Sequence, residues 1–175
     1  MNGKTVDIKN LSEFVILYFA KNGIPINRLK LQKILYYIQA WHMVYFDGNP
    51  LFEDVPEAWV NGPVYRSIYE KFKMLGSCDN LNINGDYSID VDNHFEEIKN
   101  KMNLEEEQYD FLNDIFNHYA LMPHEKLILL THIEKPWNQA REGMGPFEYS
   151  DNKISHKSMC EYYKQRLEKS KQLEK

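Results

Sequence analysis

The chain lacks the features that mark exported and membrane proteins. Only two of its 175 residues are cysteine, Cys78 and Cys160, so it can form neither a disulfide framework nor a paired-cysteine metal site, as is typical of a reducing compartment. The longest apolar stretches, Phe14–Ala20 and Leu127–Leu130, fall well short of the ~20 residues that span a bilayer. The N-terminal segment Met1–Asp7 contains no apolar region of a signal peptide. We therefore expect a soluble, cytoplasmic protein with no membrane partner.

A surplus of positive charge is also lacking. The formal net charge is -5, whereas general nucleic-acid binders usually carry a basic surplus. Between Asp86 and Asp114 ten acidic residues are opposed only by Lys99 and Lys101, whereas the tail from residue 157 to 175 has more basic than acidic residues. An acidic surface attracts a basic protein partner and repels phosphate backbones. The simpler interpretation is a solvated helix face, and the sequence leaves both open.

Catalytic signatures are absent from the sequence. It contains no phosphate-binding loop, no glycine-rich dinucleotide fingerprint and no nucleophile elbow. His124-Glu125 resembles the start of a zinc-protease motif, but residue 128 is Ile, so two imidazoles cannot share one metal ion from adjacent helical turns. The sequence predicts no catalytic residues, no cofactor and no metal site.

The pattern of apolar residues predicts a mainly α, compact multi-helix single domain over residues 1–175. In the strongest helix, Arg28–Phe46, apolar residues recur at intervals of three and four, and Asn27 can cap its start. The other expected helices run from Asp7 or Asn10 to before Asn22, from Pro63 to about Met74, near His94–Met102, from an Asn103 cap through Tyr119, over His124–Ile133, from Pro136 through Trp137, and from His156 to about Glu168. Residues 169–175 are expected to form a frayed tail.

Two small β elements are expected beside the helices. Residues 57–60 read as a short strand that leads into a turn at Gly62-Pro63, with Pro63 at the first position of the next helix. Alternating apolar and polar residues over 81–91 permit a small hairpin around Gly85-Asp86.

Three clusters stand out against this scaffold, and each has two interpretations. Leu29–Tyr37 sets lysines on an apolar helix, where they either cover the core with their stems or make a charged contact with a partner or an internal carboxylate. Trp59–Tyr65 is either a packing corner or an exposed aromatic turn. His132–Trp137 is best read as a buried, hydrogen-bonded histidine beside a tryptophan.

In this order, the clusters resemble the Panacea-domain family, an antitoxin domain found also in the SocA-type proteolytic adaptor and in phage-associated proteins. The likeness spans roughly residues 8–165. The motif residues that carry it include Leu31, Gln32, Tyr37, Trp41, Gly62, Pro63, His132, Pro136 and Trp137. The chain departs from the family in its Asn/Asp-rich segment around 77–93 and in its basic tail.

The resemblance implies a helical protein-binding module without enzymatic activity. Such a module would neutralise a cognate toxin, usually encoded beside it, by direct contact, and in the SocA type would deliver that toxin to a protease. Candidate contact residues are Trp59 and Tyr65, as partly exposed aromatic anchors, with Lys30 and Lys33 for charge.

Two other functions remain as alternatives at this point. A DNA-binding regulator of a toxin–antitoxin or prophage locus would have to use Arg28–Lys33 or the basic tail. An enzyme would need an unrecognised site around His132, Glu134 and Trp137.

Overall fold

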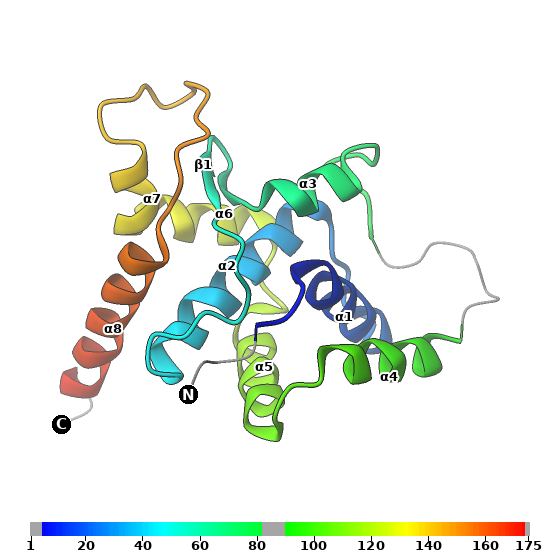
Figure 1. Cartoon of the computed structure of the whole chain (residues 1–175). Coiled ribbons are helices and arrows are strands. Elements are labelled where there is room, and N and C mark those ends of the chain that lie inside the picture. Colours follow the sequence, from blue (N-terminus) through cyan, green and yellow to red (C-terminus); the bar gives the residue numbers. More distant parts are fainter. Residues whose placement is uncertain (1–4, 82–89, 174–175) are drawn as a thin grey trace.

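The computed structural model describes residues 5–81 and 90–173. These residues form a mainly α structure with one small antiparallel sheet, as expected (Figure 1). The elements are α1 (Ile8–Lys21), α2 (Arg28–Tyr45), β1 (Glu57–Trp59), β2 (Gly62–Val64), α3 (Arg66–Phe72), α4 (Val91–Met102), α5 (Glu106–Tyr119), α6 (His124–Ile133), α7 (Lys135–Ala140) and α8 (His156–Leu173). In the described residues, no helix is long and apolar enough to cross a membrane.

Helix α2 lies at the centre of the molecule, as its apolar residues predict. The side chain of Asn27 accepts a hydrogen bond from the backbone N–H of Lys30 at 2.9 Å and so caps the helix start. α1 and α3 pack on one side of α2, whereas α5, α6 and α8 pack on others, and α4 lies against α1 (Figure 1). α2 is therefore the common support of both halves of the chain.

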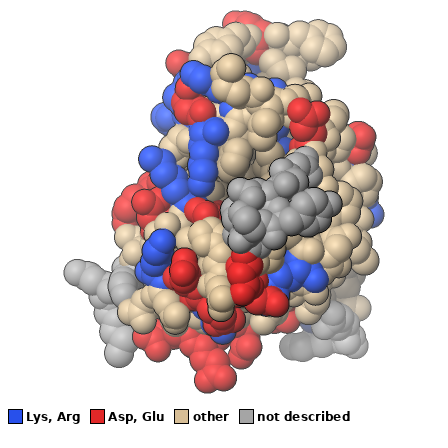
Figure 2. Space-filling model, turned by 90° about the vertical axis from the view of Figure 1, so that its right-hand side faces the viewer, with Lys and Arg blue, Asp and Glu red and all other residues tan. Residues whose placement is uncertain are grey.

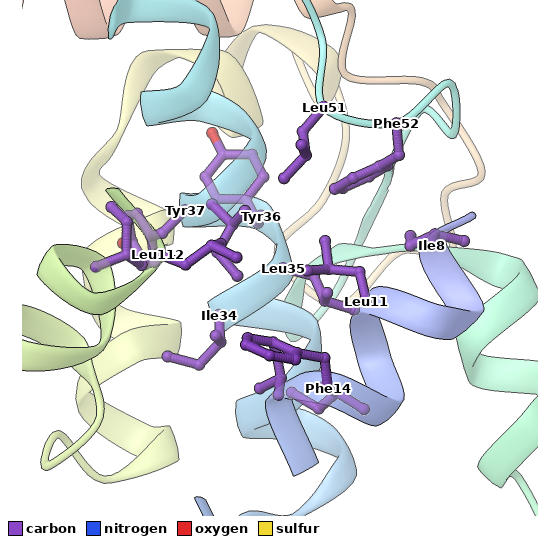
Figure 3. Close-up of a cluster of buried hydrophobic side chains, with 14 of the residues drawn as sticks. Ile8, Leu11, Phe14, Ile34, Leu35, Tyr36, Tyr37, Leu51, Phe52 and Leu112 are labelled. Atoms are coloured by element: carbon purple, nitrogen blue, oxygen red, sulfur yellow. The ribbon is translucent and has the colours of Figure 1, made fainter. Parts of the chain in front are cut away.

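One core runs through these elements. Its buried side chains come from helices α1–α6 and α8, from β1 and from the segment after α2. Figure 3 shows part of it, where side chains of α1 and α2 meet Leu51, Phe52 and Leu112. Tyr36 and Tyr37 are fully buried despite their hydroxyls.

The expectation that Pro63 begins a helix is wrong. Residues 62–64 form β2, in which Pro63 pairs with Ala58 of β1, and α3 begins only at Arg66. Gly62 makes the tight connection with a φ of 92°, a backbone conformation that favours glycine. Proline is tolerated in β2 because this strand is an edge of the two-stranded sheet and pairs only with β1.

Two other boundaries differ from the expectation. Asn103 ends α4 in a left-handed conformation with a φ of 46°, and Glu105 rather than Asn103 caps α5, forming a reciprocal capping box with Gln108. Helix α8 continues past Glu168, its expected end, to Leu173. The hairpin expected over 81–91 falls mostly on residues outside those that the structure describes.

Candidate functional site

Several of the family-motif residues lie around the β1–β2 hairpin, whereas Tyr37 and Trp41 lie farther along α2, towards α8. From α2, the Gln32 side chain forms two hydrogen bonds with the backbone of Tyr65: the Tyr65 N–H donates to Oε1 at 2.7 Å, and Nε2 donates to the Tyr65 carbonyl at 3.2 Å. The next residue of α2, Lys33, donates from Nζ to the Pro63 carbonyl at 3.2 Å. Leu31 of the same helix is fully buried. The motif on α2 therefore holds β2 and the start of α3 in place.

The two lysines of the motif lie inside the protein. Lys33 is 0% exposed and Lys30 is 6% exposed, so neither head group reaches solvent as a snorkelling side chain would. Lys30 Nζ donates to the carbonyls of Ala120 at 2.5 Å and Pro25 at 3.3 Å. Burial lowers the pKa of both lysines, and that of Lys33 falls to about 7. The internal partners of these lysines are backbone carbonyls, not the carboxylate considered from the sequence.

The two aromatic candidates differ in exposure. Trp59 is half-buried at the end of β1, where its Nε1 donates to Glu57 Oε2 at 2.7 Å and its ring meets the Tyr69 ring edge-on at 4.7 Å between centroids. Tyr65 is 0% exposed, so its expected partial exposure is wrong. Tyr65 is buried because of contacts with residues distant in the sequence. Gln32 holds the Tyr65 backbone against α2, and the Tyr65 ring packs edge-on against the Phe52 ring at 5.2 Å between centroids.

At the start of β1, Glu57 is a buried carboxylate with three donor residues. Besides Trp59, it accepts hydrogen bonds from Arg66 Nη2 and Lys153 Nζ, each at 2.7 Å. Burial alone would raise the pKa of Glu57, but the hydrogen bonds from Arg66, Lys153 and Trp59 outweigh it and lower the pKa below its usual value. Glu57 therefore remains charged at neutral pH and ties β1 to α3 and to the segment before α8.

A pocket of about 360 Å³ lies beside Trp59. Its lining joins the start of α2 with the hairpin and with the loop that carries Tyr149 and Ser150. Arg28, Val60 and Tyr69 also line it, so its walls combine aromatic and polar groups. Pockets of this size take single side chains or small ligands.

The third motif cluster supports the hairpin from α6 and α7. The His132 ring stacks on the Trp137 ring at 4.2 Å between centroids, and Trp137 Nε1 donates to the Trp59 carbonyl at 2.9 Å. Burial, followed by the nearby Lys33, lowers the pKa of His132, so the ring is neutral at pH 7. Pro136 is buried at the start of α7. His132 is therefore a packed ring beside a tryptophan. A hydrogen bond with the Val60 backbone opposes the lowering of its pKa, whereas its buried Nε2 has no hydrogen-bond partner within the described residues.

A second buried carboxylate lies between α6 and α8. Glu134 accepts hydrogen bonds from Tyr163 at 2.6 Å, Arg166 Nη1 at 2.9 Å and Tyr37 at 3.3 Å. Burial raises the pKa of Glu134 in spite of these donors. The cluster joins α8 to α2, because Tyr37 lies on α2 and Tyr163 on α8. Sequence reasoning did not find it, since its members are far apart in the chain.

A larger groove of about 580 Å³ lies between α5 and α8, with α2 as its floor. Trp41 contributes to this floor, and its Nε1 donates to the Tyr119 hydroxyl at 3.0 Å. Glu107, Asp110 and Asp114 of α5 line one side. The sequence shows their spacing of three and four residues within the acidic segment, but it does not show that α8 lies opposite them.

These clusters offer little for catalysis. Glu134 faces tyrosines and an arginine in the interior, whereas His132 stacks on Trp137, so the three residues considered for an enzyme do not converge on one open cavity. Among residues 5–81 and 90–173, no group of three or more His, Cys, Asp or Glu side chains could hold a metal ion.

Comparison with known proteins identifies the family. A family model described as "Antitoxin SocA-like, Panacea domain" matches residues 31–138, which include most of α2, the hairpin, α3–α6 and most of α7. The chain is also 34% identical over 73 residues to Antitoxin SocA of Caulobacter vibrioides (strain NA1000 / CB15N). That match covers 42% of this chain and only 38% of the relative. No solved structure matches the chain. Because the family model covers more than half of its length, the chain belongs to the Panacea-domain family of SocA-like antitoxins.

Proposed function

We propose that the protein is an antitoxin that neutralises a cognate protein toxin by direct contact, without catalysis. The observation that carries this proposal is the family match over residues 31–138, supported by the 34% identity to Antitoxin SocA. Residues 31–138 contain the hairpin and most of the elements that hold it.

The use of the charged side chains agrees with a binding role. Glu57 and Glu134 are each saturated with internal donors, and Lys33 donates to a backbone carbonyl. Charged groups that are hydrogen-bonded inside the protein stabilise the scaffold and are not available to react with a substrate. Inhibition by occlusion needs a shaped, stable surface and a few anchor side chains.

We assign the main anchor of this surface to Trp59, beside its pocket. The other three candidates, Lys30, Lys33 and Tyr65, are buried and cannot contact a partner directly. They would support binding by fixing the hairpin and the start of α2. A tryptophan that is half-buried and hydrogen-bonded is already oriented, so little entropy is lost when a partner covers it.

The test is co-expression with the product of the neighbouring reading frame, where family members usually find their toxin. The neighbour alone should arrest growth, the pair should grow, and the two proteins should co-purify. Trp59→Ala should weaken the complex, whereas Tyr149→Phe, which keeps the ring at the same pocket, should not. A neighbour that is harmless alone, or that does not bind, would refute the proposal.

The same strain tests whether the antitoxin acts as a proteolytic adaptor. If it does, the half-life of the toxin should fall when the antitoxin is present and recover when the responsible protease is deleted. An unchanged half-life together with restored growth would leave neutralisation by occlusion as the mechanism.

DNA binding is the less favoured function. Lys30 and Lys33, which a recognition helix at Arg28–Lys33 would need, are buried and bonded to carbonyls. Figure 2 shows one face of the molecule, on which basic and acidic side chains are interspersed. A salt-sensitive shift of the protein's own upstream DNA would revive this function.

A further inference from the structure

The groove between α5 and α8 is an apolar trough with a negatively charged edge. Trp41, Tyr45 and Phe46 from α2 form its floor, together with Phe111 from α5 and Leu167 from α8. Tyr45 is 57% exposed, although its ring lies 6.1 Å from the rings of both Trp41 and Phe111. A large aromatic side chain is thus left open to solvent in a concave surface, where a partner's apolar side chains would bury it.

The charge of the groove is uncompensated. Glu107, Asp110 and Asp114 follow one another at intervals of three and four, so they lie on one face of α5 and form a single row. All three are exposed, and none forms an ion pair within the described residues. Arg166 on the opposite wall is already paired with the buried Glu134 at 2.9 Å. The edge therefore offers three carboxylates to a positively charged ligand.

We propose that this groove receives a basic amphipathic helix of the toxin. The walls of the groove are helices, so no free strand edge is available to pair with an extended peptide, and an inserted segment must satisfy its own backbone hydrogen bonds. A helix does so while placing apolar side chains on the aromatic floor and Lys or Arg against the carboxylate row. The proposal rests on the proposed function, since it names where and through what chemistry the toxin binds.

The test compares two triple variants with the same change in net charge. Glu107→Gln/Asp110→Asn/Asp114→Asn removes the row. Glu53→Gln/Glu106→Gln/Glu142→Gln removes three exposed charges that do not line the groove, and it includes one from the same first turn of α5. A third variant, Tyr45→Ala, shortens the floor. Each full-length protein is checked by circular dichroism and then titrated with the neighbouring gene product at low and high salt.

The groove variant should bind roughly tenfold more weakly than the wild type at low salt, and this difference should shrink at high salt. The control variant should bind like the wild type, and Tyr45→Ala should weaken binding at both salt concentrations. Equal binding by all variants, or equal weakening by both triple variants, would overturn the groove proposal while leaving the antitoxin function intact. A wild-type protein that binds no neighbour would instead overturn the proposed function.

Size-exclusion chromatography of the wild type alone tests a different occupant. The C-terminal segment 157–175 is itself basic, so a second copy of the chain could fill the groove. A dimer that dissociates when the carboxylate row is removed would overturn the assignment to the toxin.

Discussion

Replacing Lys33 by methionine should make the protein more stable at neutral pH. Lys33 is fully buried, and its ammonium has one hydrogen-bond acceptor, the Pro63 carbonyl at 3.2 Å. Burial lowers its pKa from 10.5 to about 7. A methionine of similar length can fill the same space without a charge.

The size of the effect follows from the two pKa values. At about 1.4 kcal/mol for each pKa unit, a pKa lowered from 10.5 to about 7 corresponds to a penalty of roughly 5 kcal/mol for folding with Lys33 protonated. Methionine removes this penalty but leaves the Pro63 carbonyl unpaired, which costs about 1–3 kcal/mol. We therefore expect Lys33→Met to raise the free energy of unfolding by about 2 kcal/mol at pH 6.

The direction in which the stability changes with pH also follows from these two pKa values. Between pH 7 and 10.5 the unfolded chain holds the Lys33 proton while the folded protein releases it, so the unfolded state binds more protons and wild-type stability rises with pH. Methionine cannot titrate. The advantage of Lys33→Met should therefore be largest below pH 7 and should shrink, or reverse, as the pH approaches 10.

Urea unfolding of both proteins at pH 6, 7.5 and 9 measures this difference directly. Taking the difference cancels the titrating groups that do not interact with Lys33, but not His132, whose pKa the Lys33 charge lowers. Lys126→Met is the control, because it removes one lysine from the exposed face of α6, and its effect on stability should be within about 0.5 kcal/mol. A Lys33→Met protein that is less stable than the wild type by the same amount at every pH would refute the reasoning.

Three further predictions concern the scaffold and the anchor. In thermal unfolding, Gly62→Ala should lower the free energy of unfolding by about 3 kcal/mol, because the new Cβ would lie 2.6 Å from Cε of the buried Lys33 at a backbone φ of 92°. Gly23→Ala is the control: its φ is also positive, but no atom lies near the new Cβ, so the loss should be only about 1 kcal/mol. In chemical denaturation, Glu134→Ala should cost about 3 kcal/mol by leaving the cluster between α2 and α8 without its acceptor, and Tyr163→Phe only about 1–2 kcal/mol. Trp59→Ala should weaken toxin binding by about 2 kcal/mol or more in calorimetry while the protein stays folded. Lost stability with unchanged binding would instead make Trp59 a core residue.

The helices were predictable where local signals agree. In α2 the spacing of the apolar residues and the Asn27 cap agree, and the structure has the expected bounds within one residue. The short strand at 57–60 was also found, because a turn sequence follows it. Local patterns therefore gave the fold class and the central helix.

Features that depend on distant partners could not be predicted. Pro63 was read as a helix start because its pairing with Ala58 is a tertiary fact, and Tyr65 was read as exposed because its backbone is held by Gln32, 33 positions earlier. The burial of Lys33 needed the same knowledge. For this reason the sequence located the motif clusters but not which of their side chains face solvent.

The positions of the three tryptophans give the protein a built-in optical reporter. Trp59 lies at the hairpin pocket, Trp41 at the floor of the α5–α8 groove, and Trp137 behind the hairpin under His132. Variants that retain a single indole would emit from one of these places alone. The emission maximum and quenching of such variants would show which tryptophan is removed from solvent when a ligand binds, even for a partner whose own structure is unknown.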